Sequence, residues 1–130
     1  MTSARLWHLA LAGEWDGARR GAGYRTSTLG RSLEDEGFTH CAHAEQVDGV
    51  ARRFYADVAE PLVLLEIDPS QLTSPVVEEA PPGGDEAFPH VYGPLDSTAV
   101  VAVHEVARDR DGRPLLPVSV PGSAATGPSS

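Results

Sequence analysis

The chain has 130 residues, which is enough for one ordinary domain with its own core but too few for two. Its formal net charge of −9 and its isoelectric point near 4.8 argue against general binding to nucleic acid phosphates or anionic lipid. The single cysteine, Cys41, excludes an intramolecular disulfide and fits a reducing compartment. No signal peptide is recognisable, and no apolar run approaches the roughly 20 residues that span a bilayer. We therefore expect a cytoplasmic protein without a membrane segment.

The first third of the chain predicts a strand, a short helix and a polar loop. Residues 5–11, RLWHLAL, form a brief apolar run around His8 that favours a strand. Residues 14–20 end in basic side chains, as suits the C-terminus of a short helix. Residues 24–32, YRTSTLGRS, predict a loop whose hydroxyls and arginines suit a polar or anionic ligand. For any single residue of this loop, solvated surface is the alternative interpretation.

The central third carries the clearest helix and the most apolar strand. Residues 37–41, GFTHC, predict a strand that leads directly into an amphipathic helix. The apolar side chains of that helix recur on one face, at Val47, Val50, Ala51 and Phe54. Residues 61–67, PLVLLEI, predict a strand buried on both faces. Asp68 is expected to cap one helical turn, because Pro69 follows it.

The last third alternates strands with turns. A short strand through Val76 and Val77 is expected to end at Glu78 and Glu79, before a mobile loop over residues 80–87. In residues 88–94, FPHVYGP, flanking prolines hold His90 and Tyr92 on a stiff backbone. The remaining expectations are a β-branched strand over residues 99–106, an Asp-Gly turn over 109–113 and a disordered tail over 119–130.

This order of elements, with helices early and strands late, predicts an α+β domain over residues 1–118 followed by the tail. No phosphate loop, dinucleotide fingerprint, nucleophile elbow or zinc-type cysteine pair is present. The candidates for chemistry are therefore polar residues in strand-like segments: His8, His40, Cys41, Glu79, His90 and Tyr92.

Each candidate has a second interpretation. Histidine titrates near neutral pH and suits acid and base chemistry, yet His8 could equally be a core histidine with satisfied hydrogen bonds. His40 is the better pocket candidate because it stands at a strand end. Cys41 is expected to pack as a small hydrophobic side chain, because no base or helix N-terminus beside it would lower the pKa of its thiol. For Glu79, a solvated acidic pair with Glu78 is the alternative.

Several of these segments together resemble a bacterial family known as domain of unknown function 952. The matching features are His8 in a first strand, Tyr24-Arg25 with Ser27, LEDEGFTH at residues 33–40, VLLEID at 63–68 and FPHVYGPL at 88–95. Two positions depart from the family pattern. Thr39 stands where isoleucine is usual, and Ala42 where a small hydroxyl residue is common.

The resemblance implies an ADP-ribosyltransferase-like fold, a split β-sheet with short helices packed on it that holds NAD in a cleft between two small sheets. It places His8 at the first-strand site position, and His40 resembles a histidine of the RNA 2′-phosphotransferase branch of that fold. The third position falls to His90 or Glu79, because no unambiguous glutamate matches it.

The function implied is that of an NAD-utilising transferase or glycohydrolase. Cleavage of an N-glycosidic bond passes through an oxocarbenium-like state, which needs negative charge near the sugar and polar groups that fix the leaving amide. Glu79 or Glu66 would supply the charge. The remaining cofactor contacts are assigned to Arg25, Ser27, Arg31 and Tyr92, with an arginine for the pyrophosphate.

Two alternatives belong to other classes. One is a binding module that holds a nucleotide or ADP-ribose without turning it over. The other is a zinc site built from His8, His40, His90, Cys41 and Glu79. In each case the expected partner is a small molecule, and the sequence does not predict the acceptor or the oligomeric state.

Overall fold

The first sheet is built from the most apolar runs of the chain. In the computed structural model, which describes residues 5–18, 24, 26–28, 31–80, 83–111 and 114–115, three antiparallel strands lie in the order β1 (Leu6–Leu11), β5 (Leu62–Ile67) and β8 (Val100–Glu105). The central strand β5 is buried along nearly its whole length, and Glu66 is its least buried residue. The expected strand with two buried faces is therefore confirmed.

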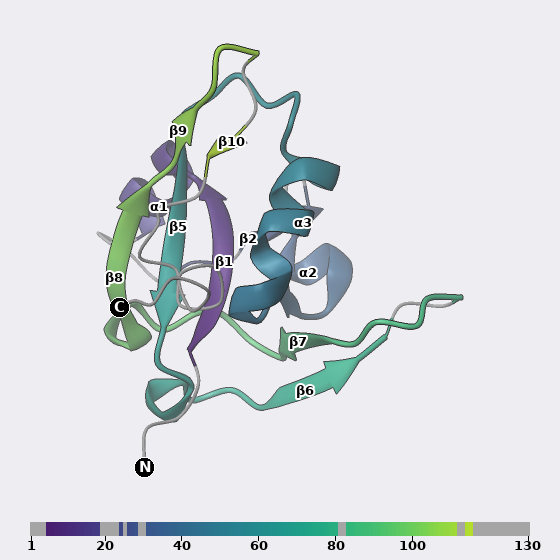
Figure 1. Ribbon diagram of the computed structural model, residues 1–130. Coiled ribbons are helices and arrows are strands. Elements are labelled where there is room, and N and C mark those ends of the chain that lie inside the picture. The colour runs from purple at the N-terminus through teal and green to yellow at the C-terminus, as the bar shows by residue number, and fades with distance from the viewer. Residues whose placement is uncertain are drawn as a thin grey trace, which may run out of the picture.

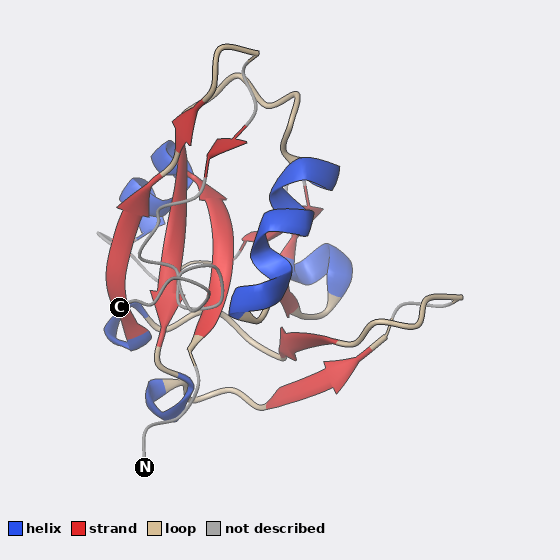
Figure 2. Ribbon diagram, viewed as in Figure 1, coloured by secondary structure: helices blue, strands red, loops and turns tan. Residues whose placement is uncertain are grey.

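The helices α1 (Ala12–Ala18) and α3 (Ala44–Phe54) cover the two faces of this sheet (Figures 1 and 2). Another α-helix, α2 (Leu33–Glu36), lies between them in the sequence. Side chains alternate along β1, so that Ala10 packs in one core with Trp15 of α1, while Leu9 packs in a second core with Val47 of α3. The predicted amphipathic helix is α3, and its apolar face lies against the sheet.

A second, smaller sheet follows the order β4 (Thr39–His40), β7 (Phe88–Val91) and β6 (Val76–Glu79), again antiparallel. Among the described residues, an isolated bridge links it to the first sheet through Ala42, which follows β4: Trp7 and Ala42 exchange two backbone hydrogen bonds of 2.8 Å. Figure 1 shows β6 and β7 extending away from the body of the domain, below α3. The chain thus has a mixed fold of antiparallel sheets and few helices, as the α+β prediction requires.

The remaining elements are short. They comprise the paired strands β2 (Thr26–Thr28) and β3 (Arg31–Ser32), the paired strands β9 (Ala107–Arg108) and β10 (Pro114–Leu115), and the 3-10 turns η1 (Pro69–Gln71) and η2 (Ser97–Ala99). Asp68 caps η1 as predicted, because its carboxylate accepts a hydrogen bond from the Ser70 amide.

Two local predictions were wrong. The expected loop over residues 24–32 contains the β2–β3 pair, and buried Tyr24 bridges to Leu95. The strand expected over residues 37–41 is reduced to Thr39–His40, because Ser32 caps α2 and Gly37, at φ +85°, ends it. The stiff backbone expected at residues 88–94 includes β7, in which the carbonyl of Pro89 accepts a hydrogen bond from the Cys41 amide. The predicted tail lies outside the described residues.

Candidate functional site

The second sheet brings His40 and His90 directly opposite each other on neighbouring strands. Their neighbours Thr39 and Val91 are also paired and are fully buried. Because side chains alternate along a strand, the two histidines project from the opposite face, away from that core. Their ring centroids lie 5.1 Å apart in an edge-to-face arrangement. Two residues separated by 50 positions in sequence therefore meet in one site.

Glu79 joins this pair from strand β6. Its Oε1 accepts a hydrogen bond of 2.8 Å from Nδ1 of His90 and another of 2.5 Å from the hydroxyl of Tyr92. These bonds, the Tyr92 hydroxyl first and His90 second, lower the pKa of the Glu79 carboxyl, while the same bond to Glu79 raises the pKa of Tyr92. Glu79 is thus ionised at neutral pH.

His40 has a carboxylate partner of its own. Its Nε2 lies 3.2 Å from Oε1 of Glu36, four residues earlier at the end of α2. Burial lowers the pKa of His40, the bond to Glu36 acts in the opposite direction, and the nearby His90 adds to the lowering. The ring is therefore neutral at pH 7. With Nε2 donating to the carboxylate, Nδ1 carries the lone pair.

Phe38 fills the centre of this arrangement. Its ring stacks on His90 with centroids 4.0 Å apart and an interplanar angle of 15°, and it also contacts the rings of His40 at 4.8 Å and Tyr92 at 5.3 Å. The His90 side chain is only 8% exposed, whereas those of His40 and Glu79 are each 38% exposed. We call these residues the outer cluster: Glu36, Phe38, His40, Glu79, His90 and Tyr92.

His8 lies on the opposite side of the His40 backbone and is not a member of the outer cluster. Its Nδ1 donates a hydrogen bond of 2.5 Å to the carbonyl oxygen of His40, which leaves Nε2 to accept one of 2.9 Å from the Tyr24 hydroxyl. Burial lowers the pKa of His8 to about 4, and it also raises the pKa of Tyr24. The predicted first-strand histidine is therefore neutral, with both ring nitrogens occupied by protein groups.

The other predicted site residues lie elsewhere or outside the described parts. Arg25 is not described, and of Ser27 and Arg31 only the backbone positions in β2 and β3 are described. Glu66, the alternative to Glu79, is on the first sheet, where it contacts Arg5 and His104. The outer cluster thus unites His40, His90, Glu79 and Tyr92 out of the eight predicted positions.

The surroundings of Cys41 bear on the alternative of a zinc site. Cys41 is 4% exposed in the core, as expected for a small hydrophobic side chain, and burial raises the pKa of its thiol to about 12. Within the described ranges, no group of three or more His, Cys, Asp or Glu side chains is arranged to hold a metal ion. The geometry therefore gives the zinc alternative no support.

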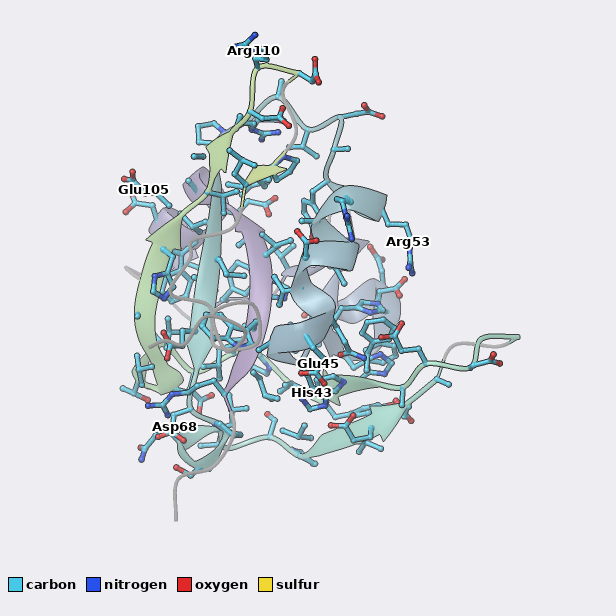
Figure 3. All side chains as sticks on the ribbon, in the orientation of Figure 1. His43, Glu45, Arg53, Asp68, Glu105 and Arg110 are labelled. Carbon is cyan, nitrogen blue, oxygen red and sulfur yellow. The ribbon has the colours of Figure 1, made fainter. Side chains whose placement is uncertain are left out.

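Sequence reasoning missed Glu36 and Phe38, although both carried a signal. Glu36 precedes His40 by four residues, and Phe38 precedes it by two, which is the spacing of side chains on one face of a strand. His43, in contrast, is not a member of the outer cluster. It precedes α3 and contacts Glu78 at 2.8 Å, near the start of the helix where Figure 3 shows it beside Glu45.

A shallow hollow of about 200 Å³ lies elsewhere on the surface. Residues of α3, among them Gln46, Gly49 and Arg53, line it together with Glu86 and Phe88. None of the predicted site residues belongs to its lining. The outer cluster is therefore a partly exposed surface site, distinct from this hollow.

The chain belongs to the family described as protein of unknown function (DUF952), whose model matches residues 10–103. It is similar to the crystal structure of protein CC0527 from Caulobacter crescentus, with 29% identity and a TM-score of 0.73 over 86% of this chain and 94% of that one. The solution NMR structure of CC0527 gives 29% identity and a TM-score of 0.71 over 86% and 92% of the two chains. No curated protein matches. In the described residues, no helix is long and apolar enough to cross a membrane.

Proposed function

We propose that this domain is an ADP-ribosyltransferase-like protein that binds NAD, or a nucleotide related to it, at the outer cluster and cleaves its N-glycosidic bond. The observation that carries the proposal is the carboxylate of Glu79, which is shared by His90 and Tyr92 beside a second histidine that has its own carboxylate. Two small antiparallel sheets, linked by the bridge between Trp7 and Ala42, agree with a split-sheet scaffold.

The chemistry assigns a role to each group. When the bond between C1′ of the ribose and the nicotinamide nitrogen breaks, nicotinamide leaves with the bonding electron pair and the ribosyl group becomes cationic. The ionised Glu79 stabilises that cation. Water or another acceptor then forms the new bond to C1′, and its proton passes to the free Nδ1 of His40. The products with water are ADP-ribose, nicotinamide and one proton.

His8 takes a different role from the one that the resemblance implied. Because both of its nitrogens are occupied, it contacts no substrate in this arrangement. It holds the carbonyl of His40, and so we assign it as a positioning residue of the outer cluster.

Nicotinamide release from NAD by the pure protein tests the catalytic half of this proposal. We expect release that falls by at least tenfold in His40→Ala and in Glu79→Gln, with thermal stability retained. The matched control is His43→Ala, which removes another His–Glu contact of the same part of the fold and should leave release unchanged. Release that is equal in all variants would contradict the assignment.

A binding module without turnover is the second candidate, and one observation favours it. Phe38 covers His90, which leaves that side chain 8% exposed and limits its access to a substrate. Calorimetric binding of NAD or ADP-ribose, lost in His40→Ala but without nicotinamide release, would select this candidate.

A further inference from the structure

We propose that Thr39 and Gly93 are positioning residues, which hold the backbone of Tyr92 in place. The held tyrosine then keeps its hydroxyl on the Glu79 carboxylate of the outer cluster. This inference rests on the proposed function, because it concerns the same site. Thr39 and Gly93 are not members of the outer cluster, and they contact no substrate in the proposed reaction.

The place of Tyr92 in the fold explains why it needs this support. It follows β7 directly, since that strand ends at Val91, and it is 40% exposed. Its ring lies 5.3 Å from that of Phe38, and its hydroxyl donates a hydrogen bond to Oε1 of Glu79. A half-exposed side chain loses rotamer freedom when it is held in one position. The bond to Glu79 is therefore favoured by a backbone that is already fixed.

Hydrogen bonds on both sides of Tyr92 fix that backbone. The Tyr92 amide donates to the carbonyl of Pro75, which directly precedes β6, at 2.8 Å. On the other side, Oγ1 of Thr39 donates to the carbonyl of Gly93 at 3.0 Å. The first bond comes from the end of β6 and the second from β4, the two strands that flank β7 in the sheet. We therefore expect a shift of the Tyr92 backbone to break at least one of them.

The burial of Thr39 makes its side chain a specific contact. Thr39 is 0% exposed and pairs with Val91 across the ladder between β4 and β7. A buried hydroxyl needs a hydrogen-bond partner, and its partner is the Gly93 carbonyl, two residues beyond Val91. The variant Thr39→Val keeps the branched shape of the side chain and removes the donor to that carbonyl.

Close approach of another segment explains the glycine at position 93. A Cβ atom there would lie 2.0 Å from Oγ and 2.8 Å from Cβ of Ser74, closer than real Cβ atoms approach other atoms. Among the described residues, the glycines with positive φ are Gly37 and Gly83, so backbone angles do not require a glycine at position 93. The missing side chain of Gly93 instead lets Ser74 pack directly on the chain beside Tyr92.

The position of Tyr92 affects the proposed chemistry through Glu79. The Tyr92 hydroxyl is the largest cause of the lowered pKa of the Glu79 carboxyl, and the bond from His90 is the second. If the backbone of Tyr92 shifts, its hydroxyl moves away from Oε1 and the pKa of Glu79 rises toward its ordinary value. Thr39 and Gly93 therefore help to maintain the negative charge that the reaction needs at Glu79.

The test follows the Glu79 carboxyl by NMR titration in the full chain. We expect Thr39→Val to raise the pKa of Glu79, as Tyr92→Phe does by removing the hydroxyl itself. Thr39→Ser retains a donor and should keep the wild-type pKa. The double variant Thr39→Val with Tyr92→Phe should have the same pKa as Tyr92→Phe alone, because Thr39 acts only through that hydroxyl.

The matched control is Thr73→Val. Thr73 also uses its hydroxyl to link two segments, since its Oγ1 donates a hydrogen bond of 3.2 Å to Asp96. The control removes a threonine hydroxyl close to Ser74 in the sequence but leaves the contacts of Gly93 intact. We expect the pKa of Glu79 to remain that of the wild type.

A second pair of variants tests Gly93 and provides a result even if Thr39→Val does not fold. Gly93→Ala places a Cβ atom against Ser74, and we expect the pKa of Glu79 to rise. Adding Ser74→Gly removes both atoms that the new Cβ meets, so the double variant should recover the wild-type pKa. If Gly93 had a structural role only, Gly93→Ala would lower Tm without a change in the pKa of Glu79.

A wild-type pKa of Glu79 in a folded Thr39→Val or Gly93→Ala would overturn this inference. So would a rise that also appears in Thr73→Val, or a further rise when Thr39→Val is added to Tyr92→Phe. Nicotinamide release from NAD is measured on the same variants and should fall in Thr39→Val as it does in Tyr92→Phe. If the wild type releases nicotinamide and Thr39→Val changes neither release nor pKa, the proposed function stands and this inference falls. If the pKa values follow the expectation but the wild type releases no nicotinamide, the positioning roles stand and the catalytic proposal falls.

Discussion

His8 and His40 are joined through one carbonyl group, yet their surroundings are opposite. His8 is 3% exposed, lies between two sheets and gives both ring nitrogens to protein partners. His40 has a side chain that is 38% exposed, and its one carboxylate partner leaves a nitrogen free. Residue type and position at a strand therefore do not determine a histidine's role. The role depends on whether both ring nitrogens are hydrogen-bonded to protein groups.

We expect the largest loss of folding stability for His8→Leu. The substitution leaves the Tyr24 hydroxyl and the His40 carbonyl without their partner, each at roughly 1–3 kcal/mol, so we expect a loss of about 2–6 kcal/mol in the free energy of unfolding. Urea unfolding measures it. The control is His104→Leu on the same sheet, where a partly exposed contact with Glu66 is lost at a cost below about 1 kcal/mol. Equal losses would mean that His8 is not a structural residue.

The pH dependence of stability is the next largest effect. His8 has a pKa of about 4 in the folded chain and an ordinary value of 6.5, so between these values the unfolded chain binds the extra proton. Stability is fully present above pH 6.5 and falls as the pH drops toward 4. At 1.36 kcal/mol per pKa unit, the loss is about 3 kcal/mol.

Unfolding of wild type and His8→Leu at pH 7, 5.5 and 4.5 measures the contribution of His8. His40 titrates with the same sign, because its pKa is also lowered, and it is present in both proteins. The carboxyl groups of Glu79 and Asp68 have lowered pKa values and lose their contribution only at still lower pH. A wild type and variant with the same slope across this range would show that His8 is not buried in its neutral form.

The variants Tyr24→Phe and Tyr92→Phe form a matched pair, and the expected stability change of the first is of intermediate size. Tyr24→Phe leaves the buried Nε2 of His8 without a donor and should cost roughly 1–3 kcal/mol. Tyr92→Phe removes a hydroxyl at the surface and should leave stability nearly unchanged, while the pKa of Glu79 rises toward its ordinary value. Thermal melts and an NMR titration of the Glu79 carboxyl measure the two results, and a destabilised Tyr92→Phe would erase the distinction between the two sites.

The smallest change in stability is expected for His40→Ala. The variant keeps the His40 carbonyl, so the hydrogen bond from His8 survives, and it removes no large apolar surface. We expect the free energy of unfolding to change by about 0.5 kcal/mol or less, while the ligand-induced shift in Tm with NAD or ADP-ribose disappears. A variant that melts several degrees lower with an undiminished ligand shift would show that His40 supports the fold and does not contact the ligand.

The sequence predicted the long elements well because their patterns reflect burial. The strand predicted at residues 61–67 and the helix that contains Val47 and Ala51 have apolar side chains at their buried positions. Both elements lie where they were expected. The short elements failed for a physical reason: β2, β3 and β4 have two or three residues each, and their pairing partners, not their own composition, make them strands.

The candidate site was predicted in part for a similar reason. His40, His90, Glu79 and Tyr92 were identified by type and local context, and they meet. The sequence left open whether His8 is a pocket residue or a core residue, because its alternatives differ only in where Tyr24 and the backbone of His40 lie. Those positions depend on contacts between residues 16 and 32 positions apart. No local pattern encodes them.

The bridge between Trp7 and Ala42 connects the segment that carries His40 to the first sheet. Two backbone hydrogen bonds tie the strand of His8 to the segment that follows His40, and the His8 ring adds a third link to the same segment. We expect local opening at these three hydrogen bonds to occur without unfolding of either sheet. The amide protons of Trp7 and Ala42 would then exchange with solvent together, sooner than those within β5. Their common exchange rate would report how often the two sheets part, and ligand binding at the outer cluster would slow it.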